Sequence, residues 1–232
     1  DSAQAKSHIY VIAKKGPSQA LKILTDDAKQ GVAEAQFHLG LMYDKGQGVP
    51  QNYDQAFKWY QRAAKQGYGS RGANIYQIAK KGVAAALNVL TDDAQQGVVE
   101  AQLILGKMYE AGHQFPHDYN EAFKWYQQAA EQGTAQAKSH IYEIAKKGSS
   151  QALKVLTADA QQGVAEAQFR LGKMYEEGHP FPQDYNEAAK WYQRSAEQDS
   201  ARAKSHIYEI AKKGSSQALK ILNDDAKLGV VE

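Results

Sequence analysis

Apolar side chains recur at helical spacing along the chain, in stripes separated by turn residues. The segment 32–67 carries two such stripes, and each predicts an amphipathic helix with one buried face. The first stripe holds Ala35, Leu39, Met42 and Tyr43, and the second holds Ala56, Trp59, Tyr60 and Ala63. The segment therefore predicts a helix, a turn and a second helix.

This pattern belongs to an internal repeat. The stretch that begins at Ser7 returns in related form at Ala73, Ser139 and Ser205, so the period is 66 residues. Each period holds a long and a short helical hairpin, which predicts fourteen helices in one array over 1–232. The long units span about 32–67, 98–133 and 164–199, and the short units span about 1–31, 68–97, 134–163 and 200–229.

Glycine and side-chain caps mark the ends of the helices. In the first long unit the turn 46–50 begins with Gly46 and closes with Pro50, a pair typical of a helix end that does not resume. The second helices follow capping-box sequences at 118–121 and 184–187, with a weaker version at 52–55. These signals set the register of each hairpin.

Composition excludes several classes of protein. Apolar residues make up 43% of the chain, enough for a core, and the formal net charge is only +2 with the charges interspersed. We expect no nucleic-acid partner and, because apolar runs are short, no insertion into a membrane. Cysteine is absent from the sequence, which excludes thiolate sites and disulfides. Both ends match the interior of the array, so we expect a fragment of a longer one.

Residues that often carry chemistry have simpler explanations here. The seven histidines follow the duplication, and no pair of them lies at i, i+4 spacing on one helix face with a carboxylate beside it, because His113 and His117 fall in a predicted turn. Adjacent carboxylates such as Asp26 and Asp27 point about 100° apart on a helix, so we assign them to solvated faces. Trp59, Trp125 and Trp191 fall on the apolar stripe and are assigned to the core. We expect no enzyme activity, metal or cofactor.

The long units resemble a known family. The run from Ala33 to Val49 keeps alanine, Leu39-Gly40, tyrosine and turn glycines, and Trp59-Tyr60 follows with paired alanines and Gly67. This pattern recurs in the other two long units and is similar to the Sel1-like repeat. The resemblance implies an all-α, right-handed superhelical solenoid related to tetratricopeptide arrays, with a scaffolding role. The short units depart from it where tyrosine replaces the helix glycine, at Tyr10, Tyr76, Tyr142 and Tyr208.

Near-identical copies disagree at positions on the first helix of each hairpin, where the resemblance implies a concave groove. We predict a partner-binding surface there. The candidate residues are Phe37, His38, Leu41, Leu103, Ile104, Lys107, Phe169, Arg170, Lys173, His140 and Glu143. Packing between neighbouring first helices is the alternative role for Phe37, Leu103 and Phe169.

We therefore predict a non-enzymatic scaffold that holds a protein or peptide. Two alternatives stay open. The first is a targeting or regulatory arm of a bacterial envelope enzyme system that acts on peptidoglycan. The second is a designed consensus array. The uneven substitutions argue against design. We expect a soluble array, periplasmic or secreted if a signal peptide precedes it, and end-to-end self-association through the terminal units.

Overall fold

The computed structural model describes residues 2–16, 18–198 and 200–227. Within these ranges the chain forms fourteen α-helices and no strand, as the sequence predicts. The helices group into two compact units, Asp1–Asp118 and Tyr119–Glu232, here named unit 1 and unit 2. The boundary falls in the turn of the long unit predicted at 98–133.

Each unit holds seven helices. Unit 1 contains α1 (Ser2–Ala13), α2 (Ser18–Lys29), α3 (Ala33–Lys45), α4 (Tyr53–Lys65), α5 (Arg71–Lys80), α6 (Ala84–Gln95) and α7 (Val99–Ala111). Unit 2 contains α8 (Tyr119–Glu131), α9 (Ala135–Lys146), α10 (Ser150–Gln161), α11 (Ala165–Glu177), α12 (Tyr185–Ala196), α13 (Ala201–Lys212) and α14 (Ser216–Lys227). Odd-numbered helices are the first helices of the predicted hairpins, and even-numbered helices are the second.

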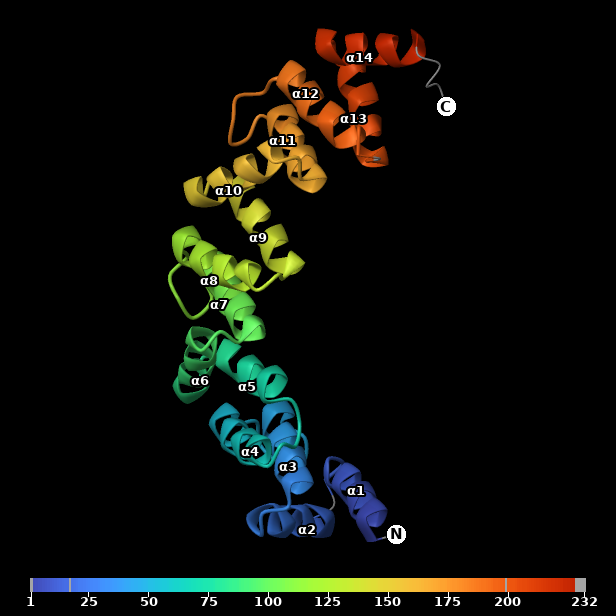
Figure 1. Cartoon of the computed structure of the whole chain (residues 1–232). Coiled ribbons are helices and arrows are strands. Elements are labelled where there is room, and N and C mark those ends of the chain that lie inside the picture. The colour runs from blue at the N-terminus through green and yellow to red at the C-terminus, as the bar shows by residue number, and fades with distance from the viewer. Residues whose placement is uncertain (1, 17, 199, 228–232) are drawn as a thin grey trace. The chain divides into compact units, whose positions relative to one another are not determined.

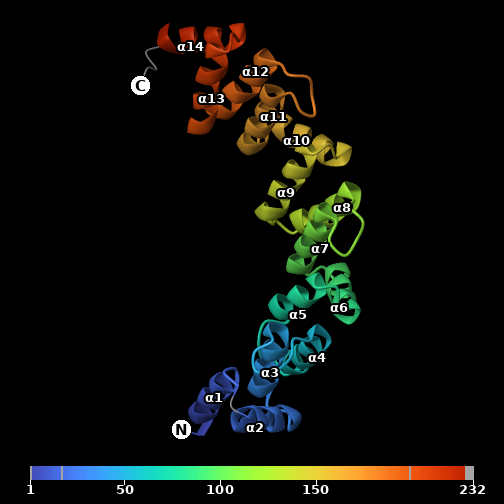
Figure 2. The same ribbon diagram turned by 180° about the vertical axis from the view of Figure 1, so that it is seen from behind.

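In several hairpins the second helix lies on the same side of the first. In unit 1, Figure 1 shows α2 to the left of α1, α4 to the left of α3 and α6 to the left of α5, and each order reverses in the rear view of Figure 2. In unit 2, α8 and α10 lie to the left of α9. First helices also contact one another within a unit, in the pairs α1 with α3, α5 with α7, and α9 with α11. They therefore present a surface built from several hairpins.

The predicted turn and cap signals are confirmed in the first long hairpin. Gly46 ends α3 in the left-handed region at φ 66°, and its N–H donates to the Met42 carbonyl. Asn52 then caps α4, because its side-chain oxygen accepts from the Gln55 N–H at 2.9 Å. In unit 2, Asp184 accepts from the N–H groups of Asn186 and Glu187 and caps α12. These caps satisfy amides that the helix itself leaves unbonded.

A tyrosine fills the seam of each type of hairpin, but from opposite helices. In the long unit, a Cβ on Gly40 would lie 2.8 Å from Tyr60 Cδ1, so glycine leaves room for the ring from α4. In the short units the ring comes from the first helix instead. The Tyr10 hydroxyl donates to Asp27 at 2.6 Å, and that of Tyr76 donates to Asp93 at 2.8 Å.

This arrangement corrects the assignment to solvated faces for two of the three carboxylate pairs. Asp26 and Asp92 are exposed, but Asp27 and Asp93 are buried, whereas Asp224 and Asp225 are both exposed as expected. Asp27 and Asp93 point into the seam, where each accepts from the tyrosine hydroxyl on the facing helix. Sequence spacing along one helix does not reveal that partner, which lies seventeen residues earlier.

Candidate functional site

Four of the predicted partner-binding residues meet in unit 2, where α9, α11 and α13 line a cavity of about 230 Å³. We name its lining the unit-2 surface. It consists of Tyr142, Glu143, Lys146, Glu166, Phe169, Arg170, Lys173, Met174 and Arg202. Tyr142, Phe169 and Met174 are buried and form the floor. The six charged residues form the rim.

Arg170 is the fixed centre of this rim. Its Nε donates to Glu166 Oε1 at 2.7 Å, its Nη2 donates to Ser139 Oγ at 3.3 Å, and its Nη1 pairs with Glu143. Only 23% of its side chain is exposed. Burial alone lowers the pKa of the guanidinium, but the bonds to the two carboxylates raise it overall. Arg170 therefore stays charged and joins α9 to α11.

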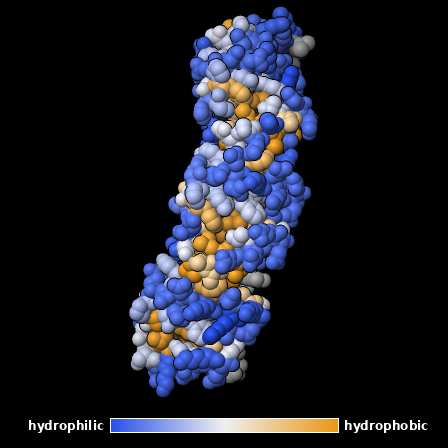
Figure 3. Space-filling view, turned by 90° about the vertical axis from the view of Figure 1, so that its left-hand side faces the viewer, coloured by the Kyte–Doolittle hydropathy of each residue, from blue (hydrophilic) through white to orange (hydrophobic). Residues whose placement is uncertain are grey.

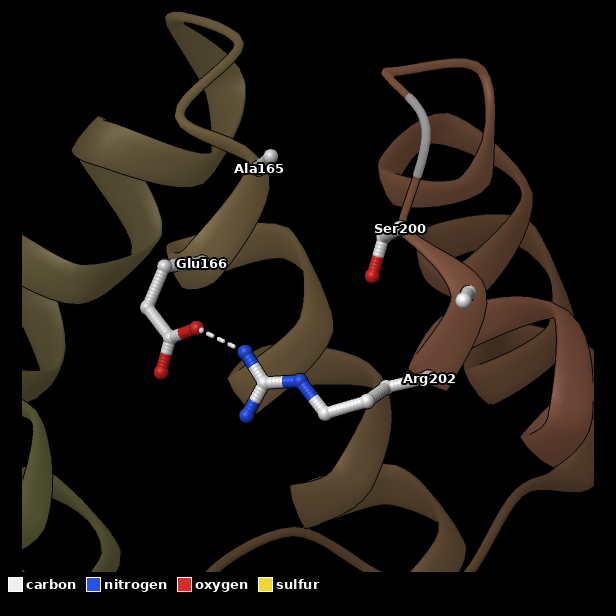
Figure 4. A pocket seen from close by; sticks show the side chains of 5 residues that line it. Ala165, Glu166, Ser200 and Arg202 are labelled. Carbon is white, nitrogen blue, oxygen red and sulfur yellow. Dashed lines mark hydrogen bonds and ion pairs between the residues drawn. The ribbon is translucent and has the colours of Figure 1, made fainter.

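A second arginine extends the surface to α13. Arg202 Nη2 lies 2.9 Å from Glu166 Oε2, and its guanidinium carbon lies 4.9 Å from the centre of the Phe169 ring. Figure 4 shows this ion pair crossing from α11 to α13, beside an adjoining cavity of about 460 Å³ that Ala165, Ser200 and Ala201 also line. Arg202 itself is largely exposed. The two cavities share Glu166 and Arg202 and so adjoin each other.

The corresponding residues of unit 1, 132 positions earlier, have the same floor but a different rim. We name them the unit-1 surface. Its floor residues are Tyr10, Phe37 and Met42, and its rim residues are Val11, Lys14, Glu34, His38, Leu41 and Ser70. The Phe37 ring lies 5.7 Å from both Tyr60 and Tyr68. This rim is mostly apolar or neutral, whereas the rim of unit 2 is charged.

His38 stands where unit 2 has Arg170. Its Nε2 lies 3.9 Å from Glu34, and its buried Nδ1 has no hydrogen-bond partner among the described residues. Burial, with the nearby Lys14, lowers the pKa of His38, although Glu34 opposes that effect. The imidazole is therefore neutral at pH 7, and it packs against the ring of Tyr10 at 5.7 Å.

The remaining predicted residues differ in how much surface they offer. Leu103 and Ile104 are buried, each with 9% of its surface exposed, while Lys107 is half-buried. His140 is half-buried and stacks on Tyr126, with 4.8 Å between ring centres. Phe37 and Leu41 are half-buried, whereas Phe169 is buried. Buried positions offer little contact to a partner and contribute mainly to packing between helices.

Sequence reasoning missed five contributors to the unit-2 surface, Tyr142, Lys146, Glu166, Met174 and Arg202. The signal for Arg202 was present, because its counterparts in the other copies are Gln4, Ser70 and Gln136. Glu166 has glutamate in every copy, so comparing copies gives no sign of its role. Its importance depends on the arginines that approach it from other helices.

The predicted core tryptophans are only partly enclosed. Trp59 is buried, but Trp125 and Trp191 are half-buried. Arginine guanidinium groups cover two of them, since Arg62 and Arg194 each lie 4.6 Å from the centre of an indole ring. Figure 3, which faces the left-hand side of Figure 1, shows separate apolar patches within a largely hydrophilic surface. The long side chains of the arginines explain how large rings are tolerated near that surface.

The segments that match a known family have nearly the same boundaries as the long hairpins. Residues 33–68, 99–134 and 165–200 match the family model of the Sel1 repeat. This chain is a Sel1-repeat protein. The match confirms the resemblance drawn from Leu39-Gly40 and Trp59-Tyr60, and each repeat begins at the first residue of α3, α7 or α11.

Two curated relatives of the Sel1-repeat chain come from fungi. It is 29% identical over 219 residues to chitin synthase regulatory factor 3 of Schizosaccharomyces pombe, covering 85% of this chain and 24% of the relative. It is 26% identical over 209 residues to chitin synthase regulator SKT5 of Saccharomyces cerevisiae, covering 80% and 30%. The chain thus spans about a quarter to a third of these relatives. They do not support the bacterial source or the peptidoglycan role that we expected as an alternative.

Solved structures with similar sequences are bacterial. A protective antigen of uropathogenic Escherichia coli with an SLR fold is 27% identical, with a TM-score of 0.46, and covers 98% of this chain and 54% of its own. A Sel1 repeat protein of Oxalobacter formigenes is 25% identical, with a TM-score of 0.47, and the match covers 95% and 76%. No described helix of the present chain is long and apolar enough to cross a bilayer.

Proposed function

We propose that this chain is a non-enzymatic binding module that holds a protein or peptide partner on its first-helix surfaces, within a regulatory assembly. The observation that carries the proposal is the contrast between floor and rim. Unit 1 and unit 2 keep an aromatic and methionine floor, yet Val11, His38 and Leu41 are replaced by Glu143, Arg170 and Lys173. Such changes alter what a surface recognises while leaving the packing beneath it intact.

The energetics of the two layers support this separation. Floor residues are constrained because a change in core volume costs several kcal/mol, on the order of 2–5 for a large residue cut to alanine. Exposed ion pairs contribute about 0–1 kcal/mol each. The exposed members of the rim are therefore free to change with little effect on folding, and contacts with a partner are the proposed reason for their differences.

The relatives suggest the type of assembly. Both fungal proteins are described as regulators of chitin synthase. We extend the proposal to a regulatory partner in an assembly that makes a glycan polymer. Because the chain covers only 24% and 30% of those proteins, this extension is a separate step from the binding role itself.

The test is affinity capture by the full chain beside a variant with an exchanged rim. In the variant Val11→Glu with Leu41→Lys, unit 1 carries residues that unit 2 already holds at the matching positions, so folding is preserved. The exposed second-helix residue Lys58→Ala serves as the control. A captured protein is then produced alone, and its affinity is measured by calorimetry.

The proposal predicts a partner that binds the parent chain and Lys58→Ala directly, and that binds the exchanged variant at least about tenfold more weakly, since a few central contacts dominate an interface. Equal binding by all three chains would move the site away from the unit-1 surface. Catalytic turnover by the purified chain would overturn the non-enzymatic assignment.

A further inference from the structure

We propose that the unit-2 surface selects an acidic peptide segment. This inference rests on the proposed function and names the chemistry of the partner at one of its surfaces. It is carried by Arg170, Lys173 and Arg202, three cations of unit 2 whose matching positions in unit 1 hold His38, Leu41 and Ser70. The occupant is an extended protein segment with aspartate or glutamate side chains.

The first step is the number of cations. The cavity is lined by four cations, Lys146, Arg170, Lys173 and Arg202, against the two carboxylates of Glu143 and Glu166. Glu177 contacts Lys146 and Lys173 from beside the cavity, at 2.6 Å and 3.7 Å, so cations still outnumber carboxylates by four to three. At the matching positions, with Lys45 in the place of Glu177, unit 1 holds two cations, Lys14 and Lys45, and one carboxylate, Glu34. Unit 2 therefore differs in the number of cations, four against two, and not in its net charge.

The second step is the supply of hydrogen-bond donors. A guanidinium has five N–H groups and a lysine ammonium has three, whereas the bonds described above engage only part of them. Arg170 uses one bond from each of its three nitrogens, and Arg202 uses one nitrogen. The ammonium of Lys173 lies 3.7 Å from Glu177, beyond hydrogen-bonding distance. Carboxylate acceptors from a partner would satisfy donors that the protein leaves to solvent.

The third step is rigidity. The bonds of Arg170 to α9 and to its own helix fix the guanidinium before a partner arrives, so binding loses less side-chain freedom there. Arg202, Lys173 and Lys146 are more exposed and can adjust around that fixed point. The two cavities adjoin at Glu166 and Arg202, so an extended segment can contact both.

The experiment is a peptide-display selection from a random library on the full chain. A second chain carries Lys173→Leu with Arg202→Ser, the residues that unit 1 holds at the same positions. A third chain carries Lys154→Ala with Lys220→Ala on exposed second-helix sites, which removes the same charge elsewhere. Circular dichroism verifies that all three chains fold.

We expect aspartate and glutamate to be enriched in peptides selected on the parent and on the third chain, and not on the second. An enriched peptide should bind the parent about tenfold more tightly than its amide version, with a preference that shrinks as salt rises. Selected peptides without acidic residues, or equal binding by acid and amide forms, would overturn this inference and leave the binding role standing. Failure to enrich any peptide on any chain would count against both proposals.

Discussion

Tyr10 is fully buried between α1 and α2, and its hydroxyl is the main hydrogen-bond donor to Asp27. That bond is the largest cause of the lowered pKa of Asp27, and Lys6 adds to it. Because the pKa of Asp27 is depressed, the bond contributes its full stability at pH values above the ordinary pKa of aspartate. The stability is lost as pH falls through the pKa of the folded state.

Tyr10→Phe should lower the free energy of unfolding by about 1–3 kcal/mol at pH 7, because a buried carboxylate loses its donor. Urea unfolding measures this loss, which should shrink below pH 4 as Asp27 is protonated. The matched control is Tyr208→Phe, since the side chain of Tyr208 is 50% exposed. Equal losses in the two variants would show that the hydroxyl bond contributes no more than a surface tyrosine does.

Glu176 is a second buried carboxylate, held between three helices. Its side chain is 10% exposed and accepts from Tyr192 at 2.7 Å and Lys213 at 3.0 Å, with His206 Nδ1 at 2.8 Å. Burial raises the pKa of Glu176, but the hydrogen bonds from these residues outweigh it and lower the pKa overall. The stability that Glu176 contributes is therefore fully present at pH values above the ordinary pKa of glutamate. It is lost as the pH falls through the lowered pKa of Glu176 in the folded state.

Glu176→Gln should therefore cost on the order of 2 kcal/mol at pH 7, the scale of hydrogen bonds to a charged group. The difference from the parent should diminish on acidification below about pH 4, where the parent loses the same charge. Denaturant titrations at several pH values give both results. Glu177→Gln is the neighbouring control, because its more exposed ion pairs should contribute less than about 1 kcal/mol. A difference that stays constant with pH would contradict this account.

At the scale of elements, sequence signals for helices and turns were sufficient because they are local. Gly46 and the caps at Asn52 and Asp184 act within a few residues of their own position, so pattern alone places them. The seam between two helices is different. Gly40 accommodates Tyr60, whereas Tyr10 reaches Asp27, and both pairs depend on which helix supplies the ring.

The candidate surfaces could be predicted only in part from the sequence. Disagreement among copies pointed to Arg170 and Lys173, and the structure places both on one cavity. The disagreement among copies did not separate exposed from buried positions. Ile104 and Phe169 were therefore grouped with Arg170 and Lys173, although both are buried. Wheel angle alone cannot decide this, because burial there depends on the neighbouring first helix and on the hairpin that follows.

At the scale of the whole molecule, stability in a repeat chain is a sum over neighbouring hairpins. The isoleucines at equivalent positions show how packing varies along it. Ile78, Ile144 and Ile210 are completely buried, whereas Ile12 on α1 is 48% exposed. In the last short unit, Tyr208 and Leu219 are likewise exposed. Helices α1 and α14 therefore have less packing to lose on opening than α11 or α12.

This difference predicts a gradient of hydrogen exchange in the chain as it stands. Backbone amides of α1 and α14 should exchange fastest, and those of α11 and α12 slowest, because local opening costs less where fewer apolar contacts break. Mass spectrometry of peptic fragments after deuterium labelling resolves the helices. Ile12→Ala should change the exchange of α1 little, whereas Ile144→Ala, at a fully buried copy, should speed exchange in α9 and its neighbours. Uniform protection across all fourteen helices would instead mean that the chain opens as one cooperative body, with neighbour contacts too strong for local opening to be seen.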